Sequence, residues 1–116
     1  RALSLAGLGM AELDEALRRI ASTGDPDLSL RSALAASLSL KAAHARYEAF
    51  LRRVPAFLSE EARRTPPVYL APILTAWEAA DALQAKALPL NIDKSSVVLE
   101  LANLVAGIAQ SPARAG

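Results

Sequence analysis

Apolar residues recur every three or four positions in four stretches of this chain, a pattern typical of amphipathic helices. The first predicted helix covers residues 10–22, where Leu13, Leu17 and Ile20 share one face. Gly24, followed by an Asp-Pro turn, is expected to end this helix. No stretch alternates apolar and polar residues for long, so the sequence predicts no β-strand.

The second predicted helix is the longest and would form the spine of the fold. It should follow a cap at Asp27 and cover residues 28–53. Pro55 lacks a backbone donor and its ring clashes with the preceding turn, so we expect the axis to kink or restart there. A short helix over residues 56–64 should follow. A seam with seven-residue spacing predicts coiled-coil-like packing of this spine and contains Ala33, Leu40, Tyr47 and Val54.

Two further helices complete the pattern. The third should start at Pro67 or Val68 and end before Pro89. The fourth should start at a cap formed by Asp93 or Ser95. These elements predict an all-α fold, a four-helix bundle that is antiparallel and up-down-up-down, in one domain over residues 1–116. Residues 1–9 are expected to be a lead-in, whose leucines could pack as a flap, and residues 111–116 a frayed tail.

Composition supports helices and describes the core. The chain has 26 alanines and 20 leucines, both strong helix formers. Hydrophobic residues make up 53% of the chain and aromatic residues only 4%, so the core must be mostly aliphatic. The mean hydropathy of +0.23 is high for so short a chain. We therefore expect some apolar surface to remain exposed for a partner.

Charge and chain ends narrow the class of protein further. The formal net charge is +1, which provides no overall attraction to nucleic acid, and nucleic acid ranks last among the expected partners. No apolar run approaches the roughly 18–20 residues of a membrane span, so we expect a soluble protein, cytoplasmic or secreted, at most peripheral to a membrane. The start at Arg1 and the excess of arginine over lysine suggest an excised domain of a larger bacterial protein.

The residues that usually carry chemistry are scarce. There is no cysteine, which removes disulfides, thiol catalysis and the usual structural zinc site. His44 is the only histidine, and Ser37 would lie about 10 Å from it along one helix, too far for a nucleophile–base pair. A di-metal bundle site needs two histidines. The sequence therefore predicts no catalytic, cofactor-binding or metal-binding residue and no small-molecule substrate; we expect His44 to be a half-buried seam residue.

One group of arginines stands out as a candidate site. If the spine bends at Pro55, these arginines should gather at one end of the bundle around a small apolar tip. The plainest interpretation is that they complement helix C-termini while the apolar residues cap the core. If the arginines also bind a partner, an acidic protein is the first expectation and anionic lipid headgroups are the second. Neighbouring glutamates would weaken the positive potential of the group. The candidate residues are Arg52, Arg53, Phe57, Leu58, Arg63 and Arg64.

These observations favour a non-catalytic helical-bundle interaction module. It would bind a protein partner, or itself, within the larger protein. The alternative is a membrane-surface localisation domain that binds anionic phospholipid through the arginine-flanked tip, as in a secreted effector. A fold of this kind does not by itself specify either function.

Overall fold

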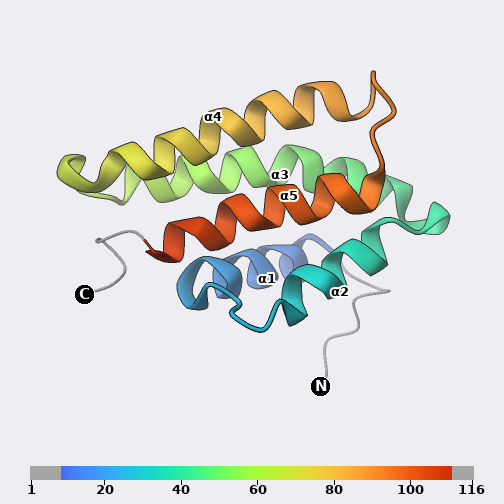
Figure 1. Cartoon of the computed structure of the whole chain (residues 1–116), viewed down its shortest axis with the longest axis horizontal. Helices are drawn as coiled ribbons and strands as arrows, with labels where there is room; N and C mark the ends of the chain where they lie inside the picture. Colours follow the sequence, from blue (N-terminus) through green and yellow to red (C-terminus); the bar gives the residue numbers. More distant parts are fainter. Residues whose placement is uncertain (1–8, 111–116) are drawn as a thin grey trace.

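The computed structural model describes residues 9–110 of the chain, and all the regular secondary structure in that range is helical, with no strand. Both the expected flap in residues 1–9 and the expected tail lie, apart from Gly9, outside the described residues. Figure 1 shows the five α-helices between short connections. They are α1 (Met10–Thr23), α2 (Ser29–Leu38), α3 (His44–Arg63), α4 (Leu70–Ala87) and α5 (Lys94–Gly107), with the 3-10 helices η2 (Lys41–Ala43), η3 (Pro67–Tyr69) and η4 (Ile108–Gln110).

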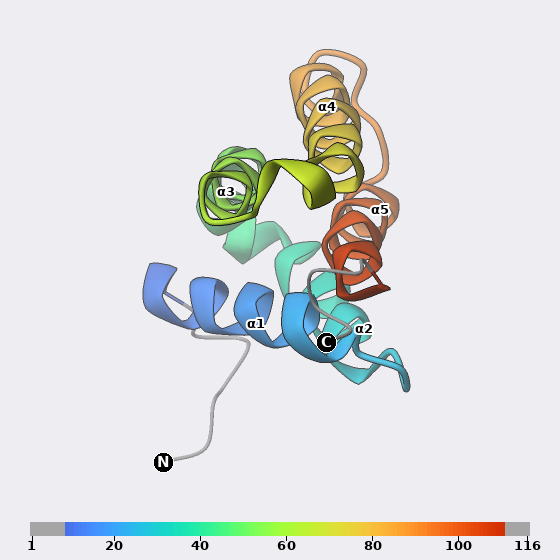
Figure 2. The same cartoon turned by 90° about the vertical axis from the view of Figure 1, so that its left-hand side faces the viewer.

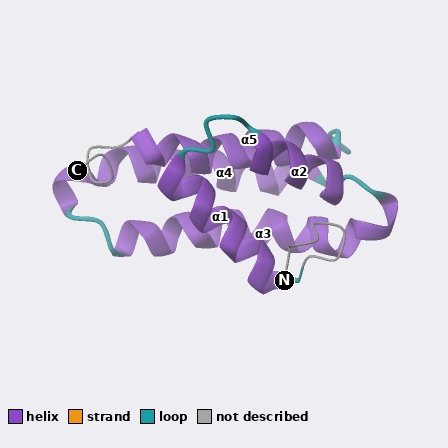
Figure 3. Cartoon of the chain, turned by 90° about the horizontal axis from the view of Figure 1, so that it is seen from below, coloured by secondary structure: helices purple, strands orange, loops and turns teal. Residues whose placement is uncertain are grey.

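Helix α5 lies at the centre and contacts each of the other four α-helices. This position explains why α5 is apolar around most of its circumference. Helices α3 and α4 pack closely together on one side of it, and α1 and α2 lie on the other (Figure 2). Figure 3 shows that α1 runs obliquely across the other helices. The all-α prediction is thus confirmed, whereas the expected count of four helices is wrong.

The predicted spine is two helices instead of one. The backbone leaves the helical region at Leu40, whose φ of −67° and ψ of 143° are extended, and η2 then leads into α3. Ser39 donates from Oγ to the Ala36 carbonyl at 3.3 Å, a local bond that competes with helix continuation. Because the chain turns here, α2 can cover α5 while α3 covers α4. Leu40, predicted in the buried seam, is exposed for the same reason.

The restart predicted at Pro55 does not occur, because α3 continues through it from His44 to Arg63. A proline in a helix interior costs about 3 kcal/mol. The turns around it bury Leu51, Val54 and Leu58 almost completely. Full burial of each such side chain is worth about 1.5–3 kcal/mol, so tertiary packing outweighs the local penalty.

The structure confirms some of the residues predicted to end or cap the helices and contradicts one. Gly24 ends α1 in the left-handed conformation, with φ of 79°, and donates to the Ile20 carbonyl at 2.8 Å. Asp93 caps α5 by accepting from the Ser96 backbone N–H at 2.9 Å. The prediction for α2 is wrong in detail, because Leu28 occupies the N-cap position and Asp27 accepts from Ser29 N at 3.1 Å. The carboxylate that satisfies the next two backbone donors belongs to Asp25.

Candidate functional site

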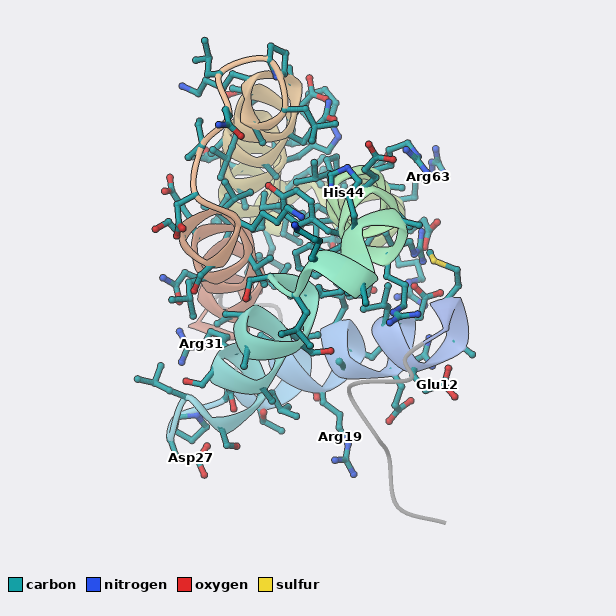
Figure 4. The ribbon with its side chains drawn as sticks, turned by 90° about the vertical axis from the view of Figure 1, so that its right-hand side faces the viewer. Glu12, Arg19, Asp27, Arg31, His44 and Arg63 are labelled. Atoms are coloured by element: carbon teal, nitrogen blue, oxygen red, sulfur yellow. The ribbon has the colours of Figure 1, made fainter. Side chains whose placement is uncertain are left out.

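Five of the six sequence-predicted site residues lie on α3 and Arg64 is its C-cap residue, but the structure separates the six by burial. Phe57 is 3% exposed and Leu58 is fully buried, so both belong to the hydrophobic core. They therefore cannot form the expected apolar tip. The four arginines are partly or fully exposed on the same helix, and Arg63 is labelled at its C-terminal end in Figure 4. No apolar residue of the predicted group remains at the surface.

Arg53 is occupied by two acidic partners. Its Nε donates to Asp14 Oδ1 of α1 at 2.5 Å, and its Nη1 and Nη2 donate to the two carboxylate oxygens of Glu60, each at 2.9 Å. Hydrogen bonding to Glu60 and Asp14 raises the pKa of Arg53, and the Arg53 hydrogen bond lowers the pKa of Glu60. This guanidinium links α1 to α3 and is not available to a ligand.

Arg63 and Arg64, but not Arg52, line a small hollow of about 280 Å³ together with Arg18 of α1. Arg64 forms an ion pair with the buried carboxylate of Glu61. Ligand pockets usually enclose about 300–1,000 Å³ and bury most of the ligand. Glutamates in the wall of this hollow offset much of the positive charge. The hollow is therefore a weak candidate for an anion site.

A more tightly bonded cluster lies at the α1–α2 turn, and sequence reasoning missed it. The buried carboxylate of Asp25 accepts from Leu30 N at 3.0 Å, from Arg31 N at 2.9 Å and from Arg31 Nε at 3.2 Å. Burial alone would raise the pKa of Asp25, but these hydrogen bonds and the charge of Arg31 together lower it. Every contact stabilises the ionised form, so this group serves structure and is poorly suited to proton transfer. The Asp-Pro turn was the only signal in the sequence.

His44 and Tyr47 do not form a catalytic pair. His44 is exposed, against expectation, and its Nε2 lies 3.2 Å from Glu48 Oε2. Tyr47 is buried, and burial, with the charge of Asp93, raises the pKa of its hydroxyl. The Lys94 ammonium lies 5.3 Å from the Tyr47 ring centroid. Ser37 belongs to another helix, and among residues 9–110 no three acidic or histidine side chains converge as metal ligands.

A surface feature that is not among the sequence-predicted site residues is the outer side of α4. This helix packs against α3 and α5 and lies at one corner of the molecule when it is viewed end-on (Figure 2). Six of the exposed residues on its solvent side, the last just past its C-terminal end, are spaced by three or four positions, and we call this row the outer seam. The outer seam consists of Ala71, Leu74, Glu78, Asp81, Ala85 and Leu88. The sequence signal for this surface was that apolar residues lie on all sides of the segment that forms α4. A helix of that composition is usually covered all round, so an uncovered side leaves apolar residues exposed.

No helix in the described part of the chain is both long and apolar enough to cross a lipid bilayer. The chain matches no protein-family model, and no match was found among curated proteins or solved structures.

Proposed function

We propose that this chain is a non-catalytic helical-bundle module that binds a protein through the outer seam of α4. The observation that carries the proposal is the exposure of two leucines on that seam. Leu74 is 44% exposed and Leu88 is 45% exposed, and they lie on one face of the helix with Ala71 and Ala85. Large apolar residues that stay exposed on one face of a helix mark an interaction surface.

Further apolar residues are exposed near both ends of α4. Val68 and Tyr69 in η3 are exposed at the N-terminal end, and Leu90 is exposed beyond the C-terminal end. A helix face with apolar anchors at three- and four-residue spacing is the usual geometry for pairing with another helix. A partner helix on the outer seam would bury the apolar residues of α4 that the other helices of this chain leave exposed.

The chemical groups elsewhere support a non-catalytic role. Asp25 is held by Arg31, and Arg53 is held by Asp14 and Glu60, so the most strongly bonded charged groups are structural. Catalysis needs a nucleophile, acid or base that faces a cleft. Membrane binding would need buried apolar area in addition to charge, and Phe57 and Leu58 are unavailable for it. We therefore favour protein binding over the membrane alternative.

Photo-crosslinking from the seam tests the proposal. A photoreactive phenylalanine replaces Leu74, and in a matched control it replaces Leu99, an exposed leucine of α5 that is 37% exposed. Both proteins are irradiated alone and in a lysate of the cells that produce the chain. We expect adducts to itself or to other proteins from position 74 and fewer from position 99.

A second variant tests the same surface without the probe. Leu74→Glu should remove those partners from an affinity pull-down while the far-ultraviolet circular dichroism stays unchanged, because Leu74 is outside the core. Leu99→Glu should keep them. Equal crosslinking from both positions, or a pull-down insensitive to Leu74→Glu, would overturn the assignment of this face.

A further inference from the structure

The outer seam of α4 has a charge pattern that restricts what can cover it. Its six positions run apolar, apolar, acidic, acidic, apolar, apolar from Ala71 to Leu88. Glu78 and Asp81 thus occupy the two central positions, where a docked helix would make its closest contacts. Within residues 9–110 neither carboxylate forms an ion pair, and Lys86 on the flank of the helix does not reach them. Any occupant must therefore compensate two carboxylates that it desolvates.

A second copy of the chain fits this pattern poorly. The spacings along the seam are three, four, three, four and three residues, which read the same in both directions. A two-fold antiparallel pairing centred on the seam would therefore set Glu78 of one copy against Asp81 of the other, twice. Four carboxylates would meet at the centre of the interface, and the repulsion between these like charges would strongly disfavour such a dimer.

We propose that the outer seam binds an amphipathic helix of a partner protein that carries Lys or Arg at the two central positions of its own apolar stripe. The inference rests on the proposed function and specifies the partner's chemistry. Leucine or alanine at the ends of that stripe would pack on Leu74 and Leu88, and the basic pair would meet Glu78 and Asp81. The seam spans about 26 Å at 1.5 Å per residue, so the docked helix needs about five turns. Charged central positions set register and partner identity at some expense of affinity.

Three synthetic helical peptides of about 18 residues, matched to the length of α4, serve as probes. They share a leucine and alanine stripe and differ only at its two central positions, which carry lysine, alanine or glutamate. Binding of each fluorescent peptide to the full chain is followed by anisotropy at low ionic strength. We expect the lysine peptide to bind with a Kd at least about tenfold lower than that of the glutamate peptide, and added salt to reduce the difference.

Charge reversal provides the matched test. Glu78→Lys leaves one lysine and one aspartate at the centre of the seam, so it should remove the preference, and the lysine and glutamate peptides should then bind about equally. Glu100→Lys, at an exposed glutamate of α5, should leave the preference unchanged. Both variants alter exposed side chains outside the core, and their thermal unfolding midpoints should match that of the wild type.

The outcomes separate the inference from the proposed function. Equal binding of all three peptides, reduced by Leu74→Glu, would overturn the charge requirement and leave an apolar docking face. Self-association abolished by Leu74→Glu, with no peptide bound, would overturn the inference in favour of a second copy. No peptide binding, a monomer in sedimentation and no crosslink from position 74 would overturn both.

Discussion

Arg31 and Asn103 lie 72 residues apart in the sequence, and Arg31 Nη1 donates to Asn103 Oδ1 at 2.8 Å. This bond joins the start of α2 to α5, and Figure 4 shows the Arg31 side chain at that junction. The same guanidinium donates from Nη2 to the Asp25 carbonyl at 2.7 Å and from Nε to the Asp25 carboxylate. One side chain therefore holds the α1–α2 turn on the central helix.

Replacement of Asp25 by asparagine should destabilise the protein. The amide keeps the shape but removes the charge that pairs with Arg31, and it cannot accept at both oxygen positions from the three donors. We expect a loss of about 2–3 kcal/mol in the free energy of unfolding, measured by urea denaturation. Asp27→Asn is the control. Asp27 accepts from Ser29 N and Oγ at the surface, where asparagine serves as well as aspartate, so this change should alter stability by less than about 0.5 kcal/mol.

The contribution of Asp25 should depend on pH in a definite direction. Its pKa is lowered in the folded state, so the folded protein binds fewer protons there than the unfolded chain does. Stability from this group is fully present above the unfolded pKa of about 4 and is lost as pH falls through the folded value. The stability difference between wild type and Asp25→Asn should therefore shrink below about pH 4. A difference that stays constant down to about pH 2 would contradict the assignment.

Arg53 and Arg52 are neighbours that should contribute very differently to stability. Arg53→Gln breaks the bonds to Asp14 and Glu60 and should cost about 1–2 kcal/mol, because the pairing is multidentate and partly shielded from solvent. Arg52→Gln alters an exposed side chain and should cost less than about 0.5 kcal/mol. Chemical denaturation of both variants at low and high salt measures the difference. Equal costs would mean that the Arg53 pairs contribute nothing to folding.

Phe57→Ala distinguishes a core residue from a surface anchor. Because Phe57 is almost fully buried on α3, its truncation should cost about 3–5 kcal/mol. Val68→Ala, at a residue that is 79% exposed, should cost less than about 0.5 kcal/mol. Thermal unfolding followed by circular dichroism gives both values. A mild effect of Phe57→Ala would return this residue to the candidate binding surface.

Leu28 carries backbone strain that a better-suited residue should relieve. Its φ is 65°, in the left-handed region that costs an ordinary residue roughly 1–2 kcal/mol, and its side chain is half exposed. At the α4–α5 turn the chain itself uses asparagine, Asn91, at a φ of 51°. We expect Leu28→Asn to raise the free energy of unfolding by about 0.5–1 kcal/mol and Asn91→Leu to lower it by a similar amount. Changes of the same sign in both variants would argue against backbone strain as the cause.

Expectations for the candidate site depended on an assumed bend. Four arginines and two apolar residues were expected to gather at a tip because Pro55 was expected to redirect the chain. The helix instead continues, so Phe57 and Leu58 are buried in the core and Arg53 forms an ion pair with Asp14 of α1. Asp14 is 39 residues away in the sequence, and spacing along the chain cannot reveal such a partner.

The sequence by itself determined the helical class and the end of α1 at Gly24, and it limited the cap of α5 to Asp93 or Ser95. These features depend on residues within a turn or two of each other, where periodicity, backbone freedom and capping act directly. Tertiary structure alone decided the break before His44, the continuity through Pro55 and the exposure of the outer seam of α4. Each of these depends on which distant helix packs against a given face, because burial against a neighbour outweighs local preference and leaves uncovered whichever face has no neighbour.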